Sequence, residues 1–202
     1  MRALEHMARC TGLLLALAFA AVGGCADPRD EGKKPGPHFD DLVADDRAVF
    51  EVVLEDFAAW KDATFGVQEG VLALDPLSAE LVYRNLADTR QSIAPITNVV
   101  SDELIEAFLK RNKSRIDVTS LVARLPSVRS FTRPDKSGFF EVAPDGAKAI
   151  GSISMPGFDP GRTRAMVQIN HSWSIHGAVV TYVLSKQDGT WKIQARDQQV
   201  FL

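Results

Sequence analysis

The chain has 202 residues, of which 46% are hydrophobic, and a formal net charge of −3 at pH 7. This length and apolar content suffice for one folded domain that buries most of the surface its unfolded chain exposes. The mild acidic balance excludes the general electrostatic attraction on which nucleic-acid-binding and anionic-lipid-binding surfaces depend. We therefore expect no nucleic-acid partner.

The first part of the chain predicts export and a lipid anchor. Arg2 and Arg9 give a basic start, and the apolar run GLLLALAFAAV is shorter than the roughly 20 residues that a membrane span needs. Residues 1–24 are interpreted as a signal peptide, with an ordinary signal cut nearby as the alternative. The run ends in VGGC, which resembles the lipobox of bacterial lipoproteins. The resemblance implies that Cys25 is lipidated and becomes the N-terminus.

This resemblance implies a protein of the bacterial cell envelope, outside the cytosol and held to the membrane by its acyl chains. Ala26 stands where aspartate would favour inner-membrane retention, so the outer membrane is favoured in a Gram-negative cell. Cys10 leaves with the signal and Cys25 carries the lipid, which leaves the folded domain without a thiol. Disulfides, thiol catalysis and cysteine metal sites are thereby excluded. After removal of residues 1–25 the chain has 21 basic and 25 acidic residues, a net charge of −4.

Residues 25–40 contain the lipidated cysteine and the segment ADPRDEGKKPGPH, whose charge, proline and glycine predict a disordered tether. A single globular domain is expected over residues 41–202. Its first element is predicted from ADDRAVFEVVLEDFAAWK, in which apolar residues recur at helical spacing after a cap at Asp45 or Asp46. The acidic side of this helix is interpreted as a solvated face.

Four segments follow before the β-rich part of the chain. GVLALDP predicts a short strand closed by Pro76, and SAELVYRNLAD predicts a helix capped by Ser78. SDELIEAFLKRNK predicts a helix capped by Ser101, with acidic residues in the first turn and basic residues in the last. The basic end complements the helix dipole, and an anion site is the alternative. The pattern of IDVTSLVARL leaves helix and strand both open.

From Phe139 onward the pattern is that of β-strands separated by turns. The predicted strands are FFEV, AKAIGSISM, RAMVQI, AVVTYVLS and WKIQARDQQVF, and the turns are PDG, PGFDPG and QDG. Helices first and strands afterwards favour the α+β class. We expect N-terminal helices packed on the apolar face of a curved antiparallel sheet of about four to five strands. A cone-like fold of the ketosteroid-isomerase or cystatin kind is a candidate, and implies no function.

The last hairpin can be registered from its turn. Asp188 and Gly189 form a two-residue turn signal that pairs Gln187 with Thr190. Counting outward then pairs residues across the two strands as follows: Lys186 with Trp191, Leu184 with Ile193, Tyr182 with Ala195 and Val180 with Asp197. Arg196 is assigned by the same count to the opposite face.

The preceding hairpin contains the stretch NHSWSIHG. Apolar residues share one face when Val167 pairs with Val180, a register that sets His171 opposite His176 across a loop formed by Ser172–Ile175. Asp197 is then expected on the same side.

Four residues around this hairpin end are the speculative ligand-binding set. His171, His176 and Asp197 are residue types that bind metals. The alternative is that they are ordinary histidines at a hairpin end, because no HxH or HExxH spacing occurs. Trp173 could stack on a sugar or base, or fold back on the sheet. No catalytic residue, metal ligand or cofactor is assigned, because the chain lacks a GxSxG elbow and a glycine-rich phosphate loop.

Three stretches in order resemble a group of uncharacterised bacterial extracytoplasmic proteins: SDELIEAFLKRN, FFEV with GAKAIGSISMPGFDPGRTRAMVQI, and AVVTYVLSKQDGTWKI. The resemblance covers residues 101–200 at the level of pattern and implies no activity. Many members of the group have cysteines around the loop where this chain has Ser172 and His176.

The sequence therefore favours a lipid-anchored envelope protein of non-enzymatic type that binds a protein partner or a small molecule. A purely structural envelope component is a second reading. The alternative from another class is a metal-assisted hydrolase that uses His171, His176 and Asp197. An apolar surface patch would favour the structural component, and a deep pocket containing the three side chains would favour the enzyme.

Overall fold

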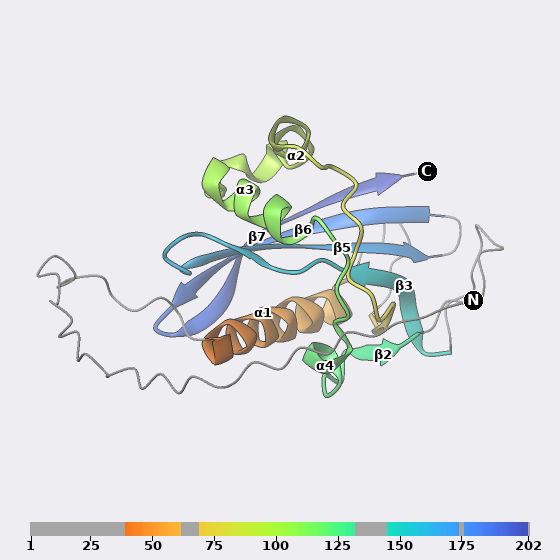
Figure 1. Ribbon diagram of the computed structural model, residues 1–202. Helices are drawn as coiled ribbons and strands as arrows, with labels where there is room; N and C mark the ends of the chain where they lie inside the picture. Colours follow the sequence, from red (N-terminus) through yellow and green to blue (C-terminus); the bar gives the residue numbers. More distant parts are fainter. Residues whose placement is uncertain (1–38, 62–68, 132–144, 174–175, 202) are drawn as a thin grey trace, which may run out of the picture. The chain divides into compact units, whose positions relative to one another are not determined.

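The computed structural model describes residues 39–61, 69–131, 145–173 and 176–201 (Figure 1). The predicted signal peptide, Cys25, most of the tether and the FFEV strand lie outside the described residues. The fold is α+β, as expected.

The described strands form one seven-stranded mixed sheet. Its main path runs β2-β1-β3-β5-β6-β7, and β4 pairs with β5 beside this path. The strands are β1 (Val71–Leu74), β2 (Val128–Ser130), β3 (Ala147–Ile153), β4 (Gly157–Phe158), β5 (Arg164–Trp173), β6 (His176–Gln187) and β7 (Thr190–Phe201).

The expectation of a purely antiparallel sheet of four to five strands was wrong. The two neighbours of β1 run parallel to it, whereas the other pairs are antiparallel. The difference arises because the chain passes through a series of helices between β1 and β2 and so returns to the sheet in the same direction. The short strands β2 and β4 lie in segments without an alternating apolar pattern.

Five helices are described, and only one of them begins at the cap that the sequence predicted. They are α1 (Phe39–Ala59), α2 (Leu86–Ser92), the 3-10 helix η1 (Ala94–Val99), α3 (Asp102–Arg111) and the short α4 (Thr119–Val122). The cap of α3 is confirmed, since the Oγ of Ser101 accepts a hydrogen bond from the Leu104 amide. The predicted helix from Ser78 was wrong. Asn85 caps α2 instead, and the Ser78 hydroxyl accepts a hydrogen bond from the Ile116 amide at 2.8 Å.

Helices cover both faces of the sheet, not one apolar face as expected (Figure 1). We call the face under α1 the first face and the face under α2, η1 and α3 the second face. Alternate residues of β5 enter different cores: Val167 packs with α1, and Met166 packs with α3. α3 lies so close to β4 that a Cβ on Gly157 would come within 2.2 Å of the Phe108 Cα. Only glycine fits at this contact.

The last hairpin follows its predicted register up to a bulge. The pairs Gln187–Thr190, Lys186–Trp191 and Leu184–Ile193 are confirmed, but the register shifts by one residue between Leu184 and Val183. Gln194 is the extra residue. Tyr182 therefore pairs with Arg196 instead of Ala195. On the first face, Asp56 accepts hydrogen bonds from the Arg196 guanidinium at 2.7 Å and from the Tyr182 hydroxyl at 3.1 Å.

Two adjacent aspartates in α1 are buried, where a helix cap followed by an acidic solvated face was predicted. The helix begins earlier, at Phe39, so both aspartates lie within it. Asp46, only 3% exposed, forms a bidentate ion pair with Arg111 at the end of α3. Burial raises the pKa of Asp46, although Arg111 opposes this effect. Arg111 also donates to the carbonyl oxygen of Pro156 at 2.8 Å.

Asp45 contacts the sheet instead of α3. Its carboxylate accepts hydrogen bonds from Lys186 at 2.7 Å, from the Trp191 indole at 3.0 Å and from Arg162 at 3.0 Å. Burial acts to raise the pKa of Asp45, but the three donors outweigh it and the pKa is lowered. The aspartate pair thus joins α1 to both the last hairpin and the helix on the second face.

We expect Asp46→Asn to lower the free energy of unfolding by about 3 kcal/mol, because it leaves the half-buried Arg111 charge without its carboxylate. Urea unfolding measures this loss. The matched control is Arg90→Gln, which removes an ion pair with Asp102 in which both side chains are about half exposed. This control should cost less than about 1 kcal/mol. Equal losses in the two variants would contradict the role given to Asp46.

Candidate functional site

The two histidines of NHSWSIHG share a face but do not face one another. β5 and β6 pair His171 with Ala178 and Trp173 with His176, so that only residues 174 and 175 lie between the strands. The predicted four-residue loop was wrong. The observed register differs from the predicted one by two residues, and a shift of two keeps every side chain on its face. Hydrophobic patterning alone could not separate the two registers.

His171 is a core residue. Its side chain is 5% exposed, and its ring stacks on Trp173 at 4.9 Å and meets the edge of Phe57 at 4.9 Å between centroids. Neither ring nitrogen has a hydrogen-bond partner in the described part of the chain. Burial lowers the pKa of His171 to about 3, with a contribution from the charge of Lys148. His171 is therefore a neutral ring at neutral pH.

Trp173 contacts both histidine rings, with 5.7 Å between its centroid and that of His176. It also packs against the core under α1, as expected for a tryptophan that folds back on the sheet. A ligand could not stack on the face of its ring that His171 already covers.

Asp197 lies apart from the histidines. The bulge at Gln194 pairs it with Thr181 instead of Val180, so its side chain is on the second face. Burial raises the pKa of Asp197. In the described ranges, no group of three or more His, Cys, Asp or Glu residues could hold a metal ion. The structure thus does not assemble the predicted set of His171, His176 and Asp197.

Lys148 is a functional candidate that sequence reasoning missed, but its contacts explain it structurally. Its Nζ donates to the carbonyl oxygens of Phe57 and Trp60, both at 2.6 Å, and so caps the C-terminus of α1. Burial lowers the pKa of Lys148 to about 8, helped by Arg196 and opposed by Asp56. Two carbonyl acceptors already bind its ammonium group, which leaves little capacity for a ligand.

A hollow of about 380 Å³ lies on the second face, at the end of the sheet that α2 and α3 leave open. We call it the sheet hollow. Its floor is a row of neighbouring residues across three strands, Ser152, Asn170 and Val179. Its wall is residues 75–85, which link β1 to α2 and which we call the crossover segment. A volume of this size lies at the small end of the range for small-molecule sites.

The side-chain amide of Asn170 connects this floor to the crossover segment. Its Nδ2 donates to the carbonyl oxygen of Glu80 at 2.8 Å. A carbonyl oxygen can only accept, so the bond fixes which way the amide points. The Oδ1 of Asn170 is buried and has no partner among the described residues. A buried acceptor of this kind is costly unless a donor meets it.

Two exposed apolar side chains complete the rim of the sheet hollow. Val82 in the crossover segment is 49% exposed, and Phe201 at the end of β7 is 42% exposed. Acidic groups stand at the other side of the rim, where Asp75 and Glu80 lie beside Arg115. The sheet hollow therefore combines hydrogen-bond acceptors, one guanidinium group and an apolar edge.

The wall of the sheet hollow is held firmly in place. The Nε of Arg115 donates to the Ser78 carbonyl at 2.7 Å, and its terminal nitrogen donates to Asp75 and to the Leu77 carbonyl, both at 3.2 Å. The amides of Asp75 and Ala79 bond to β3 at 2.8 Å each. These bonds connect the crossover segment to the sheet and to the chain after α3, so the hollow is largely preformed.

Replacing His171 should change how stability depends on pH. In the unfolded chain the imidazole of His171 binds a proton below about pH 6.5, whereas in the folded state its pKa of about 3 keeps it neutral. The free energy of unfolding should therefore fall by about 2 kcal/mol as the pH is lowered from 7 to 5. His171→Phe keeps the aromatic packing and should lack this loss. It should also be more stable at pH 7 by about 1 kcal/mol, because no unpaired ring nitrogen is buried. Urea midpoints at the two pH values test this, and equal pH slopes in variant and wild type would contradict it.

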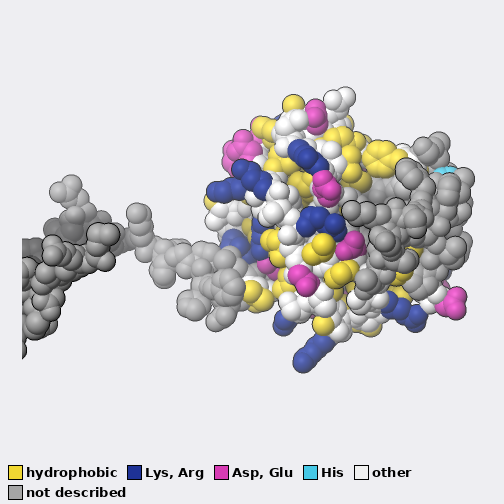
Figure 2. All heavy atoms as spheres, turned by 45° about the vertical axis from the view of Figure 1, so that its right-hand side comes forward, with side chains coloured by type: hydrophobic (Ala, Val, Ile, Leu, Met, Phe, Trp, Pro, Cys, Tyr) yellow, Lys and Arg dark blue, Asp and Glu magenta, His cyan; other side chains and the backbone are white. Residues whose placement is uncertain are grey.

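The surface, the helices and the comparisons with known proteins add three observations. On the face that Figure 2 shows, basic, acidic and hydrophobic side chains are interspersed. No helix within the described part of the chain is both long and apolar enough to cross a membrane. Comparison with protein-family models, with curated proteins and with solved structures found no match. The sheet hollow is accordingly the main basis for a function.

Proposed function

We propose that the protein is a lipid-anchored, non-enzymatic binding module of the bacterial envelope. Its ligand is a small molecule that carries N–H donors beside an apolar group, such as an amino acid amide or the amino end of a short peptide. The observation that carries the proposal is a preformed hollow whose lining combines acceptors of Asp75, Glu80 and Ser152 with an apolar edge at Val82 and Phe201.

The chemistry of the sheet hollow supports this ligand class. The hydroxyls of Ser152 and Ser172 line the hollow and can accept hydrogen bonds. The carboxylates of Asp75 and Glu80 pair with Arg115 and Arg84 but can accept further hydrogen bonds, which favours a ligand with N–H donors. Val82 and Phe201 provide an apolar edge at the rim. An ammonium or amide next to a branched alkyl group meets all three features.

The anchor rests on the lipobox resemblance at Cys25. The described fold begins at residue 39. It follows a segment of 14 residues, 25–38, whose first residue is Cys25. The ligand-binding unit would then remain close to the bilayer while the tether permits rotation.

We expect leucine amide to bind the sheet hollow of the full chain. The readout is the change in the methyl NMR signals of Val82 and Val179, which border the hollow. Gly177→Leu should weaken binding at least about tenfold, because its side chain would occupy the hollow and exclude ligand. A Cβ at Gly177 meets only one backbone oxygen, at 3.9 Å, so the substitution should leave the fold intact.

The matched control for this experiment is Gly161→Leu, in an exposed turn where a Cβ meets no atom closer than 3.6 Å. It should bind leucine amide like wild type. The proposal fails if leucine amide leaves the Val82 and Val179 signals unchanged, or if the Gly161 and Gly177 variants behave alike.

The anchor is tested by partitioning between water and a detergent phase after expression in bacteria. Wild type should enter the detergent phase, and Cys25→Ala should lose this behaviour because no thiol remains to receive acyl chains. Cys10→Ala is the matched control and should partition like wild type, since Cys10 lies in the predicted signal peptide. Equal partitioning of wild type and Cys25→Ala would refute lipidation.

A further inference from the structure

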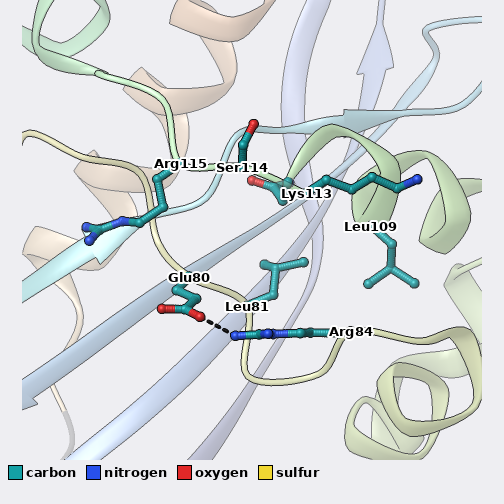
Figure 3. A pocket seen from close by; sticks show the side chains of 8 residues that line it. Glu80, Leu81, Arg84, Leu109, Lys113, Ser114 and Arg115 are labelled. Carbon is teal, nitrogen blue, oxygen red and sulfur yellow. Dashed lines mark hydrogen bonds and ion pairs between the residues drawn. The ribbon is translucent and has the colours of Figure 1, made fainter.

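A second hollow, of about 410 Å³, lies between the crossover segment and the end of α3 (Figure 3). We call it the basic hollow. It shares Glu80 and Arg115 with the sheet hollow but is lined otherwise by different residues. Three cationic side chains border it, Arg84, Lys113 and Arg115.

The charges of the basic hollow are not fully neutralised. Arg84 forms an ion pair with Glu80, in which both side chains are largely exposed. Arg115 turns its guanidinium away from Lys113, as Figure 3 shows, toward Asp75 and two carbonyl oxygens. Lys113 has no acidic partner among the described residues. One positive charge therefore remains for an anion.

The helix dipole of α3 does not account for this arrangement. Lys110 and Arg111 occupy the last turn of the helix, where basic residues complement the dipole, and Arg111 is paired with Asp46. Lys113 and Arg115 lie beyond the helix end, and Arg84 belongs to the crossover segment. Segments far apart in sequence thus bring positive charge to one hollow.

The centre of the basic hollow is apolar. Leu81 and Leu109 face one another there (Figure 3), Leu81 buried and Leu109 half-buried. The Ser114 hydroxyl points away from these two leucines (Figure 3). An apolar centre beside an unpaired ammonium group is complementary to an amphipathic anion.

From these contacts we infer that the basic hollow binds an anionic group, a carboxylate or a phosphate ester, carried on a short apolar chain. Lys113 donates to the anion, and the chain lies on Leu81 and Leu109. Arg84 adds a further donor when it exchanges the exposed Glu80 carboxylate for the ligand. This site is independent of the proposed function, because its ligand has the opposite charge and contacts other side chains.

The experiment titrates hexanoate into the full chain and follows the methyl NMR signals of Leu81 and Leu109. For a probe of this size, we expect a dissociation constant of about 1 mM. Lys113→Gln should weaken binding at least about tenfold, because a charge-assisted hydrogen bond is lost, and Lys113→Arg should retain most of it. Lys110→Gln is the matched control. It removes an exposed lysine three residues away that does not line the hollow, and should bind like wild type.

Further probes decide the ligand chemistry. Hexanamide, neutral and of the same chain length, should bind much more weakly than hexanoate. Hexyl phosphate compared with hexanoate identifies which anion is preferred, and binding of either one at the Leu81 and Leu109 signals supports the inference. It is overturned if neither anion shifts the Leu81 and Leu109 signals, if hexanamide binds as well as hexanoate, or if Lys110→Gln weakens binding as much as Lys113→Gln. Leucine amide, read at Val82 and Val179, reports on the sheet hollow separately.

Discussion

The architecture depends on two buried carboxylates that follow one another in α1. Consecutive residues of a helix point about 100° apart, so Asp45 and Asp46 reach different partners. Asp45 binds the last hairpin through Lys186 and Trp191, while Asp46 binds Arg111 beyond the edge of the sheet. A helix on one face is thereby fixed to a helix on the other. Buried ion pairs of this kind add little net stability over an apolar contact, but they strongly penalise any other arrangement.

The helices α2, η1 and α3 cover only part of the second face of the sheet. The uncovered part is where the proposed sheet hollow lies. α3 lies close to the sheet at Gly157, where the strand backbone meets the helix without an intervening side chain. Farther along the strands no helix of the described residues covers the sheet, which presents Ser152, Asn170 and Val179 to the crossover segment instead. The same segment separates the sheet hollow from the basic hollow. Its hydrogen bonds to Arg115 therefore support both hollows together.

Local signals predicted local structure well. The Ser101 cap, the charges of α3 and the Asp188–Gly189 turn all act within a few residues, and the structure has them as expected. The predictions from sequence were wrong where contacts between residues far apart in the chain determine the local structure. Ser78 resembles a helix cap, yet its hydroxyl and backbone bond to Ile116, 38 residues later.

The candidate site could not be predicted, for related physical reasons. The histidine register differs by two residues, a shift that leaves the apolar pattern unchanged, and the bulge at Gln194 has no turn residue to signal it. The sheet hollow adjoins the stretch that the sequence singled out, since Asn170 precedes His171. The wall of the hollow is joined to its floor by the hydrogen bond from Asn170 to Glu80, 90 residues earlier in the chain, and the periodicity of the sequence does not encode such a contact.

The bulge in β7 has a consequence for the solution behaviour of the protein. β7 is the last strand of the described sheet path and is 12 residues long, so a row of its backbone donors and acceptors has no strand beside it. Long regular edges of this kind invite pairing with the edges of other molecules. Gln194 interrupts the regular spacing, and the charged Lys192 and Arg196 flank it. Molecules at high local concentration would thus be hindered from adding strand to strand into aggregates.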